Sequence, residues 1–169
     1  MGNNENIELF EKYITENQNK FYRLTYSYIH DKDTSLDLVQ EAIISGLKSV
    51  NKLREPQYLN TWFYRILVNT CLSYLRQNKK HETLELLEDT IETKDSCFDE
   101  IKKKEILRVV MSLEPDLKTV IFLKYYEEMT FEEISSVTKI NVNTVKSRLY
   151  KALDILKEKL GDYYDESRC

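Results

Sequence analysis

The chain has 169 residues, of which 41% are hydrophobic and 32% are charged, and its formal net charge is −4. This length allows one ordinary domain or two small ones. A net acidic chain excludes a general nucleic-acid coat, so any contact with DNA must be local. With three glycines and two prolines, the chain has little material for the tight turns of β-hairpins. We therefore expect an all-α fold.

The sequence lacks the features that mark membrane, secreted or metal proteins. No apolar run approaches the roughly 18 residues that cross a bilayer, and the first residues lack the basic and apolar parts of a signal peptide. We therefore expect a cytoplasmic protein. Three widely spaced cysteines and two histidines indicate neither a disulfide framework nor a metal site.

The first predicted helices lie between residues 10 and 50. Apolar residues first recur at helical spacing in two groups, which are Phe10, Tyr13 and Ile14, and then Phe21, Leu24, Tyr28 and Ile29. The clearest amphipathic pattern follows, with an apolar stripe of Leu36, Val39, Ile43, Leu47 and Val50. We expect its N-cap at Asp33, Thr34 or Ser35. The opposite face carries Asp37, Gln40, Glu41 and Lys48.

A third helical pattern, over residues 59–75, follows a loop that contains Pro56. Residues 61–80 include four basic side chains and no acidic one. Aromatic rings beside positive charge suit single-stranded nucleic acid, which they bind by stacking and phosphate contacts. Aromatic residues at helical spacing more often pack in a core, so we expect Trp62 and Phe63 mainly to pack. The predicted strand contacts are Trp62, Arg65, Asn69, Arg76, Lys79 and Lys80.

Residues 81–100 form a composition break, with eight acidic residues and one lysine. Their weak apolar pattern offsets too little of the cost of ordering the backbone, which predicts a linker with at most one short helical piece. An acidic block is also read simply as solvated surface. The break divides the chain into two small helical domains, residues 1–80 and 101–169, joined by an acidic linker.

The second domain is predicted to hold helices at residues 101–111, 115–126, 131–137 and 142–160. Thr130 and Glu133 have the spacing of a capping box, which starts a helix. A polar break ends that helix, and Asn141 is a good N-cap for the next one. Two capped helices joined by a few residues predict a helix-turn-helix.

The last helix carries the strongest functional pattern. Its predicted buried stripe is Val145, Leu149, Ala152, Leu153 and Leu156. Its other side is polar, and residues 141–160 contain five basic and two acidic side chains. On charge alone this is an ordinary surface helix with lysines, but the two caps and the residue pattern favour insertion into a major groove. The predicted duplex contacts are Asn143, Thr144, Lys146, Ser147, Arg148 and Lys151.

Four segments, in order, are similar to motifs of the extracytoplasmic-function (ECF) sigma factors of RNA polymerase. They are Asp37-Leu-Val-Gln40-Glu41, Trp62-Phe-Tyr-Arg65-Ile-Leu-Val-Asn69, Phe131-Glu-Glu-Ile134 and Asn143-Thr-Val-Lys-Ser-Arg-Leu149. The resemblance spans nearly the whole chain. One departure is Ser73, where the family commonly has aspartate.

The resemblance implies a role and a set of partners. The first domain would bind the β′ clamp helices of core RNA polymerase through Asp37, Gln40 and Glu41, with further contact to the β subunit. It would also open the minus-10 promoter element, with Asn69 at the pocket for a flipped base. The second domain would read the minus-35 element. The resemblance further implies a membrane-anchored anti-sigma factor, and no catalytic residue, cofactor, metal or small-molecule substrate.

The segment Trp62-Phe-Tyr-Arg-Ile-Leu-Val resembles most a subgroup of low-GC Gram-positive bacteria that responds to envelope attack such as lysozyme. Three other readings remain open at this point. A dimeric helix-turn-helix regulator would bind duplex operators without polymerase, and a protein-binding adaptor would not need Lys146 or Lys151. An all-helical enzyme is disfavoured, because the sequence has no phosphate loop, nucleophile elbow or ligand cluster.

Overall fold

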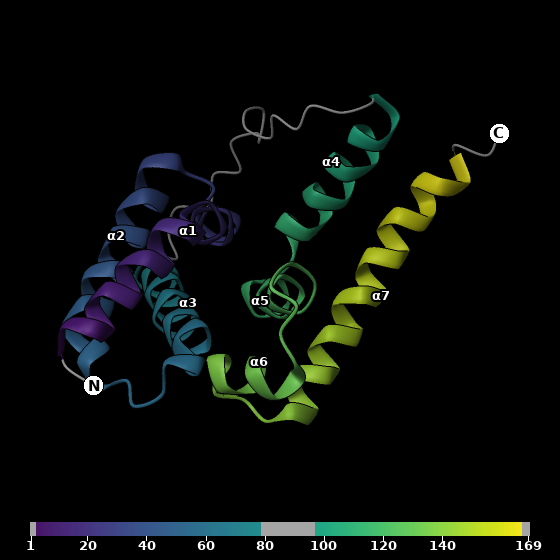
Figure 1. The fold of residues 1–169 in the computed structure, drawn as a ribbon. Coiled ribbons are helices and arrows are strands. Elements are labelled where there is room, and N and C mark those ends of the chain that lie inside the picture. The colour runs from purple at the N-terminus through teal and green to yellow at the C-terminus, as the bar shows by residue number, and fades with distance from the viewer. Residues whose placement is uncertain (1–2, 79–96, 167–169) are drawn as a thin grey trace. The chain divides into compact units, whose positions relative to one another are not determined.

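The structure is a computed structural model of the chain and describes residues 3–78 and 97–166 (Figure 1). Within these two ranges every regular element is helical, which confirms the all-α prediction. The described residues form two compact units. The first contains residues 3–78 and 132–140, and the second contains residues 97–131 and 141–166.

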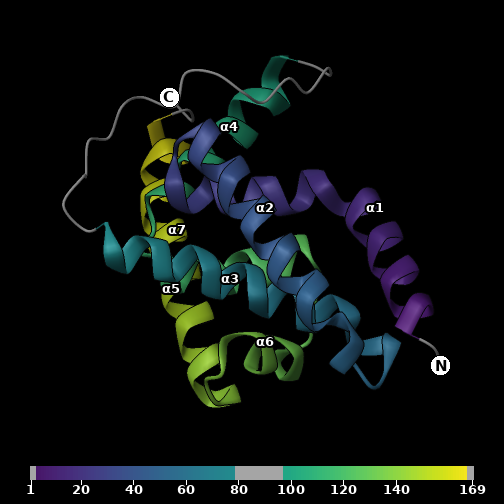
Figure 2. The ribbon, with the colours of Figure 1, turned by 90° about the vertical axis from the view of Figure 1, so that its left-hand side faces the viewer.

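Three long helices build the first unit, and each packs against the other two (Figures 1 and 2). They are α1 (Asn3–Ile29), α2 (Lys32–Ser49) and α3 (Leu59–Gln77). Two short 3-10 turns, η1 (Val50–Lys52) and η2 (Pro56–Tyr58), connect α2 to α3. The two apolar groups of the N-terminal pattern therefore lie on one continuous helix.

The core of the first unit is a cluster of aromatic rings centred on Phe63, which is fully buried. The Phe63 ring centroid lies 4.8 Å from that of Phe21, 5.4 Å from that of Phe10 and 6.0 Å from that of Tyr13. All three contacts are edge-to-face, a geometry that adds attraction beyond burial alone. Trp62 packs its ring 5.9 Å from that of Phe10. The prediction that Trp62 and Phe63 pack is confirmed.

The buried side of α2 differs from the predicted stripe. Leu36 and Leu47 are 42% and 40% exposed, so the prediction that they face the core is wrong. The buried residues of α2 are instead Ser35, Leu38, Val39, Ala42 and Gly46. The α2 helix is thus rotated about its axis relative to the predicted orientation. Gly46 explains this rotation, because a Cβ atom built there would lie 2.6 Å from Cζ of Phe10. Small residues at this crossing let the ring of Phe10 sit against the backbone of α2.

The predicted N-cap of α2 is also wrong. Asp31, not Asp33, Thr34 or Ser35, caps the helix, and its Oδ2 accepts a 2.9 Å hydrogen bond from the Thr34 N–H. The helix begins early because α1 ends abruptly at His30, which has a φ of 58° and whose N–H donates to the Tyr26 carbonyl. Such a left-handed residue is a common way to end a helix. Ser35 lies inside α2 and is buried.

The second unit contains α4 (Cys97–Ser112), α5 (Pro115–Ile121) and α7 (Val142–Glu166), which pack against one another. The α5 helix continues into a π-helical turn, η3 (Phe122–Tyr126). The short α6 (Phe131–Thr138) precedes α7 in the chain. Residues 132–140, which include all of α6 except Phe131, fall in the first unit. All four helices predicted for the second domain are confirmed in place.

The predicted acidic linker lies mostly outside the described residues, as do Lys79 and Lys80. Its last four residues, 97–100, belong to α4, so that helix begins inside the range assigned to the linker. None of the helices in the described ranges combines the length and the apolar character that a membrane span requires.

Replacement of Gly46 by alanine should destabilise the first unit. The added methyl group collides with Phe10, whose ring is confined by the aromatic cluster, and such overpacking costs about 1–3 kcal/mol. Urea unfolding followed by the fluorescence of Trp62, the only tryptophan, measures this change. The matched control is Gly161→Ala, where nothing lies within 4 Å of the new methyl group. Equal stability of parent and Gly46→Ala would contradict this packing.

The Asp31 cap should make the stability of the first unit depend on pH. Hydrogen bonds from Thr34, first from its side chain and then from its backbone N–H, hold the pKa of Asp31 below its ordinary value. The stabilisation is therefore complete above the pKa of the unfolded chain and is lost as the pH falls through the lower folded pKa.

At neutral pH we expect Asp31→Ala to lower the melting temperature and Asp31→Asn to change it little, because an amide oxygen caps equally well. Thermal melts between about pH 7 and pH 3 should show the gap between parent and Asp31→Ala closing on acidification. The gap between Asp31→Asn and Asp31→Ala should not change, and a parallel pH dependence of all three would argue against the charged cap.

Candidate nucleic-acid interface

The outer face of α3 presents the predicted strand contacts that the structure describes. Trp62, Arg65, Asn69 and Arg76 follow helical spacing along one side, while the other side is buried in the core. Asn69 and Arg76 are exposed, and Trp62 and Arg65 are half-buried. These four residues therefore share one side of α3, and their contact with an opened strand stays a prediction.

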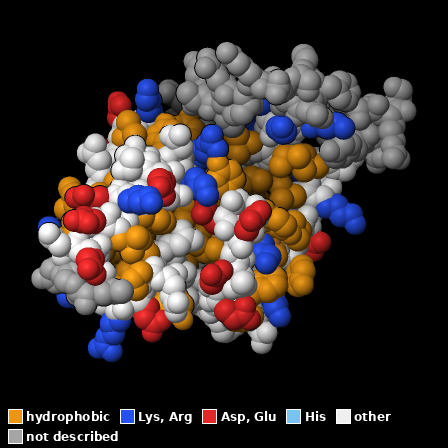
Figure 3. Space-filling view, viewed as in Figure 1, with side chains coloured by type: hydrophobic (Ala, Val, Ile, Leu, Met, Phe, Trp, Pro, Cys, Tyr) orange, Lys and Arg blue, Asp and Glu red, His pale blue; other side chains and the backbone are white. Residues whose placement is uncertain are grey.

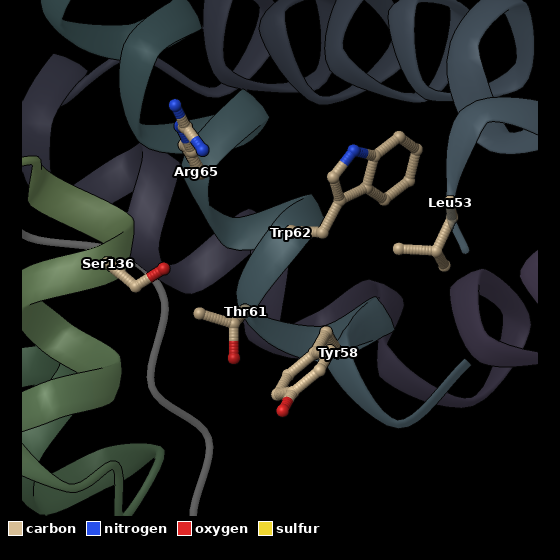
Figure 4. Close-up of a pocket in the computed structure, with 6 residues that line it drawn as sticks. All are labelled: Leu53, Tyr58, Thr61, Trp62, Arg65 and Ser136. Atoms are coloured by element: carbon tan, nitrogen blue, oxygen red, sulfur yellow. The ribbon is translucent and has the colours of Figure 1, made fainter. Parts of the chain in front are cut away.

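A shallow pocket lies at the beginning of α3 (Figure 4). Its lining side chains include Leu53, Tyr58, Thr61, Trp62 and Arg65. The indole of Trp62 extends from α3 to the side of Leu53, whereas Arg65 extends in a different direction. Tyr58, one of the aromatic rings that the sequence places beside these basic residues, is 56% exposed. An exposed ring and a guanidinium beside one pocket are groups that stack on bases and pair with phosphate.

Ser73 lies on the same side of α3 as the predicted strand contacts. Its hydroxyl oxygen accepts a 3.3 Å hydrogen bond from Nη2 of Arg76. A serine at this position therefore orients the guanidinium along the helix without neutralising its charge. The charge of Arg76 remains available to an anionic partner.

The exposed face of α2 forms a second candidate surface. Asp37, Gln40 and Glu41 are all exposed, as predicted. One turn further along, Ile44 is 53% exposed and lies on the same side of the helix. The sequence pattern did not single out Ile44. This surface therefore combines two carboxylates with an apolar side chain, a composition that suits a protein partner.

The two helices of the predicted helix-turn-helix, α6 and α7, are separated by three residues. Lys139, with a φ of 57°, turns the chain after α6. Asn141 caps α7 as predicted, because its Oδ1 accepts hydrogen bonds from the Thr144 N–H at 2.8 Å and the Thr144 hydroxyl at 3.0 Å. The hydroxyl of Thr144 is therefore engaged in the cap. The α6 helix begins at Phe131, directly after the position that the predicted capping box assigns to the N-cap.

The α7 helix is amphipathic in the predicted orientation. Val145, Leu149 and Ala152 are buried, and Leu153 and Leu156 are half-buried. Between residues 142 and 151, the exposed side chains of the polar side are Asn143, Ser147, Tyr150 and Lys151. Tyr150, which the sequence also places on this polar side, is 59% exposed. An exposed aromatic ring between polar groups adds apolar contact area to this face.

Two predicted duplex contacts are held by neighbours within the second unit. Nη2 of Arg148 forms an ion pair of 3.4 Å with Oδ2 of Asp116 at the start of α5. Lys146 is half-buried, and its Nζ lies 5.3 Å from the ring centroid of Phe131. The Arg148 pair links α7 to α5, whereas Lys146 stays beside the exposed residues of α7.

Basic and acidic side chains are interspersed on the face of the molecule seen in Figure 3. This distribution agrees with the net charge of −4 and with the expectation that DNA contact is local. The predicted DNA contacts include basic side chains of α3 and, separately, of α7. Their attraction to phosphate should weaken with added salt.

Two buried titratable side chains lie away from these faces. Burial raises the pKa of the Cys71 thiol to about 12, and Sγ lies 3.6 Å from the Thr25 hydroxyl. Burial also lowers the pKa of Lys118 to about 8. Desolvation is the leading cause of both shifts, so neither indicates a catalytic pair. In the described part of the chain, no group of three or more Cys, His, Asp or Glu residues is placed to hold a metal ion.

The described residues thus form a helical protein with basic and amide side chains on the outer side of α3 and on the polar side of α7, and comparison with known proteins gives its family. Residues 13–81 match Sigma-70 region 2, and residues 103–156 match Sigma-70, region 4. The RNA polymerase sigma factor SigV of Bacillus subtilis is 39% identical over 148 residues, which cover 87% of this chain and 88% of that protein. The ECF RNA polymerase sigma-E factor of Haemophilus influenzae is 30% identical, covering 89% and 87%.

The fold is shared with the sigma factor RpoE of Bartonella quintana, solved in complex with the anti-sigma factor NepR. The TM-score is 0.75 at 17% identity, over 90% of this chain and 96% of that one. The chain belongs to the sigma-70 family and is an ECF sigma factor. It is thus a transcription initiation factor and not an enzyme.

Proposed function

We propose that this sigma factor uses α2 to bind core RNA polymerase, α3 to hold the opened minus-10 strand and α7 to read the minus-35 duplex. The observation that carries the proposal is the orientation of α3 and of α7, each about its own helix axis. Each helix buries its apolar stripe and leaves its basic and amide side chains outside. These are the groups that bind nucleic acid.

We assign residues 1–80 to the polymerase-binding and minus-10 domain, 81–100 to the linker and 101–169 to the minus-35 domain. The separate matches at residues 13–81 and 103–156 support this division. The α6 helix is assigned to the second domain by chain order, because only three residues separate it from α7.

The polymerase contact is placed on Asp37, Gln40 and Glu41, with Ile44 as an added apolar contact. The carboxylates would pair with basic side chains of the β′ clamp helices, and the β subunit would bind elsewhere on the chain. An apolar side chain surrounded by polar groups resembles the core and rim of a protein interface. Ile44 would be buried when the complex forms.

The strand-holding role is assigned to Trp62, Arg65, Asn69 and Arg76, together with Lys79 and Lys80 beyond the described residues. Exposed Asn69 can donate to and accept from the edge of a flipped base. Contacts to the unpaired strand would offset the cost of melting the duplex. No chemical step by the protein is required.

Duplex reading is assigned to the N-terminal half of α7. Asn143, Ser147 and Lys151 are exposed there beside half-buried Lys146, and we add Tyr150 to this set. The positive end of the helix and its free backbone N–H groups favour phosphate. Thr144 and Arg148 would act through the cap and the Asp116 pair that hold them, and so place the neighbouring side chains.

The alternative of a conventional regulator is tested by the need for polymerase. Gel-shift assays with the purified chain, with and without core enzyme, should show tight promoter binding only with core. Run-off transcription on genomic DNA would identify the promoters. Tight duplex binding by the chain alone, without gain from core enzyme, would favour the regulator instead.

Two variants should separate the polymerase surface from the duplex surface. Lys146→Ala with Lys151→Ala should abolish promoter-specific run-off while core association persists, since losing both contacts costs at least about 2 kcal/mol, or roughly 30-fold in affinity. Glu41→Lys should lose core association instead. The matched control, Lys157→Ala with Lys159→Ala, removes the same charge from the later part of α7. Transcription by the first variant at the parent rate would refute the assignment of α7.

We also infer that an anti-sigma factor controls this protein and holds it at the membrane, on the cytoplasmic side, until the cell envelope is attacked. Two observations support this inference. The Bartonella quintana protein that shares the fold was solved with an anti-sigma factor, and a Bacillus subtilis sigma factor is 39% identical to this chain. The motif beginning at Trp62 resembles the lysozyme-responsive subgroup.

Exposure of the source bacterium to sublethal lysozyme should therefore raise transcription from the promoters found by run-off. The expected reason is release of the sigma factor from its inhibitor, which increases the fraction bound to core enzyme. Quantitative measurement of those transcripts, with mild heat as the comparison stress, checks the inference. Transcripts that rise with heat and ignore lysozyme would contradict it.

A further inference from the structure

One aromatic ring in the second unit lies close to two lysine ammonium groups. Nζ of Lys124, in η3, is 4.5 Å from the ring centroid of Phe131, and Nζ of Lys146, in α7, is 5.3 Å from it. Both distances fall within the roughly 6 Å over which a ring face attracts a cation. The three residues come from three separate segments of the second unit.

The two lysines differ in how firmly they are held. Lys124 has a second anchor, because its Nζ donates a 3.3 Å hydrogen bond to the Met129 carbonyl. Met129 is itself fixed, since its side chain is 2% exposed and its N–H donates to the Leu123 carbonyl at 3.0 Å. Lys124 is therefore held in place beside the Phe131 ring. Lys146, which comes from α7, contacts the same ring.

We propose that Phe131 is a positioning residue of the duplex-reading surface, whose ring holds the Lys146 ammonium in place before DNA arrives. A free lysine side chain loses about 2 kcal/mol of rotamer entropy when it is fixed, and ordering it beforehand removes part of that cost from binding. The proposal rests on the proposed function of α7. It adds that Phe131, at the start of α6, sets the position of the Lys146 side chain in the following helix, α7.

Lys124 contributes to the same arrangement. It brings a second positive charge to the ring, so a phosphate that approaches Lys146 meets two cations. Its own ammonium is engaged by the Met129 carbonyl, which assigns it to support and leaves Lys146 as the side chain that reaches DNA.

A purely structural role of Phe131 predicts a different behaviour. The aliphatic stems of lysines often cover apolar surface, and leucine would supply such surface as well as phenylalanine does. The two roles therefore separate on replacement of the ring by a non-aromatic side chain of similar bulk. Phe131→Leu removes the ring face, whereas Phe131→Tyr keeps it.

The binding test uses holoenzyme and a short duplex carrying the upstream element of the strongest promoter found by run-off. We expect Phe131→Leu to weaken binding about two- to fivefold, the range of one exposed cation–ring contact, and Phe131→Tyr to match the parent. In a Lys146→Met background, Phe131→Leu should cause no further loss. Phe122→Leu is the matched control. It makes the same replacement at a ring that stacks on another aromatic ring, that of Tyr126, with 4.6 Å between the centroids.

Equal losses from Phe131→Leu with and without Lys146 would show that the ring acts only through packing, and would overturn the proposal. Parent-like binding by Phe131→Leu would overturn it as well, while leaving the function of α7 intact. A parent holoenzyme with no preference for the promoter duplex would overturn the proposed function and this inference together.

A second measurement does not depend on the folding of any variant. The ring current of Phe131 should shift the ε-methylene protons of Lys146 upfield in the NMR spectrum of the free parent protein. Lys157, which is exposed on α7, gives the reference shift. Coincident shifts for the two lysines would refute the ring contact.

Discussion

The packing of Phe63 against Phe10, Tyr13 and Phe21 is the constraint on which the first unit depends. These edge-to-face contacts join α1 to α3 and fix the rotation of α3 about its own axis. Because Phe63 is fully buried, its helical neighbours Trp62, Arg65 and Asn69 must lie toward or on the outside. The surface proposed to hold the opened strand is therefore a consequence of how the core packs, and no separate device is needed to orient it.

The same logic places the polar side of α7. Buried Val145, Leu149 and Ala152 fix its rotation, the Asn141 cap fixes where it begins, and the Arg148–Asp116 pair links it to α5. Such a pair at the surface contributes little stability by itself. Its effect is geometric, because it engages the guanidinium of Arg148 at the flank of α7 and so orients that helix against α5.

Under the proposed function, this acidic chain binds DNA through a few positive side chains that lie on two helices. The segments that carry them are basic locally, while the excess of acid lies elsewhere in the sequence. The mixture of basic and acidic side chains on the face seen in Figure 3 disfavours unspecific binding of that face along DNA. Affinity for a promoter would then require both helices at once, which a polymerase partner that holds the two domains can supply.

The sequence by itself determined the helices, the Asn141 cap and the polar sides of α3 and α7, because helical periodicity and capping are local properties of the chain. The ECF motifs could also be recognised from the sequence, because each is a short contiguous segment. Only the tertiary structure decided the rotation of α2, where Ala42 and Gly46 face the core because the Phe10 ring needs room there. The tertiary structure also showed that Asp31 caps α2, that Ile44 is exposed and that the Phe131 ring contacts Lys146. These depend on the end of a preceding helix or on residues distant in sequence, which no local pattern encodes.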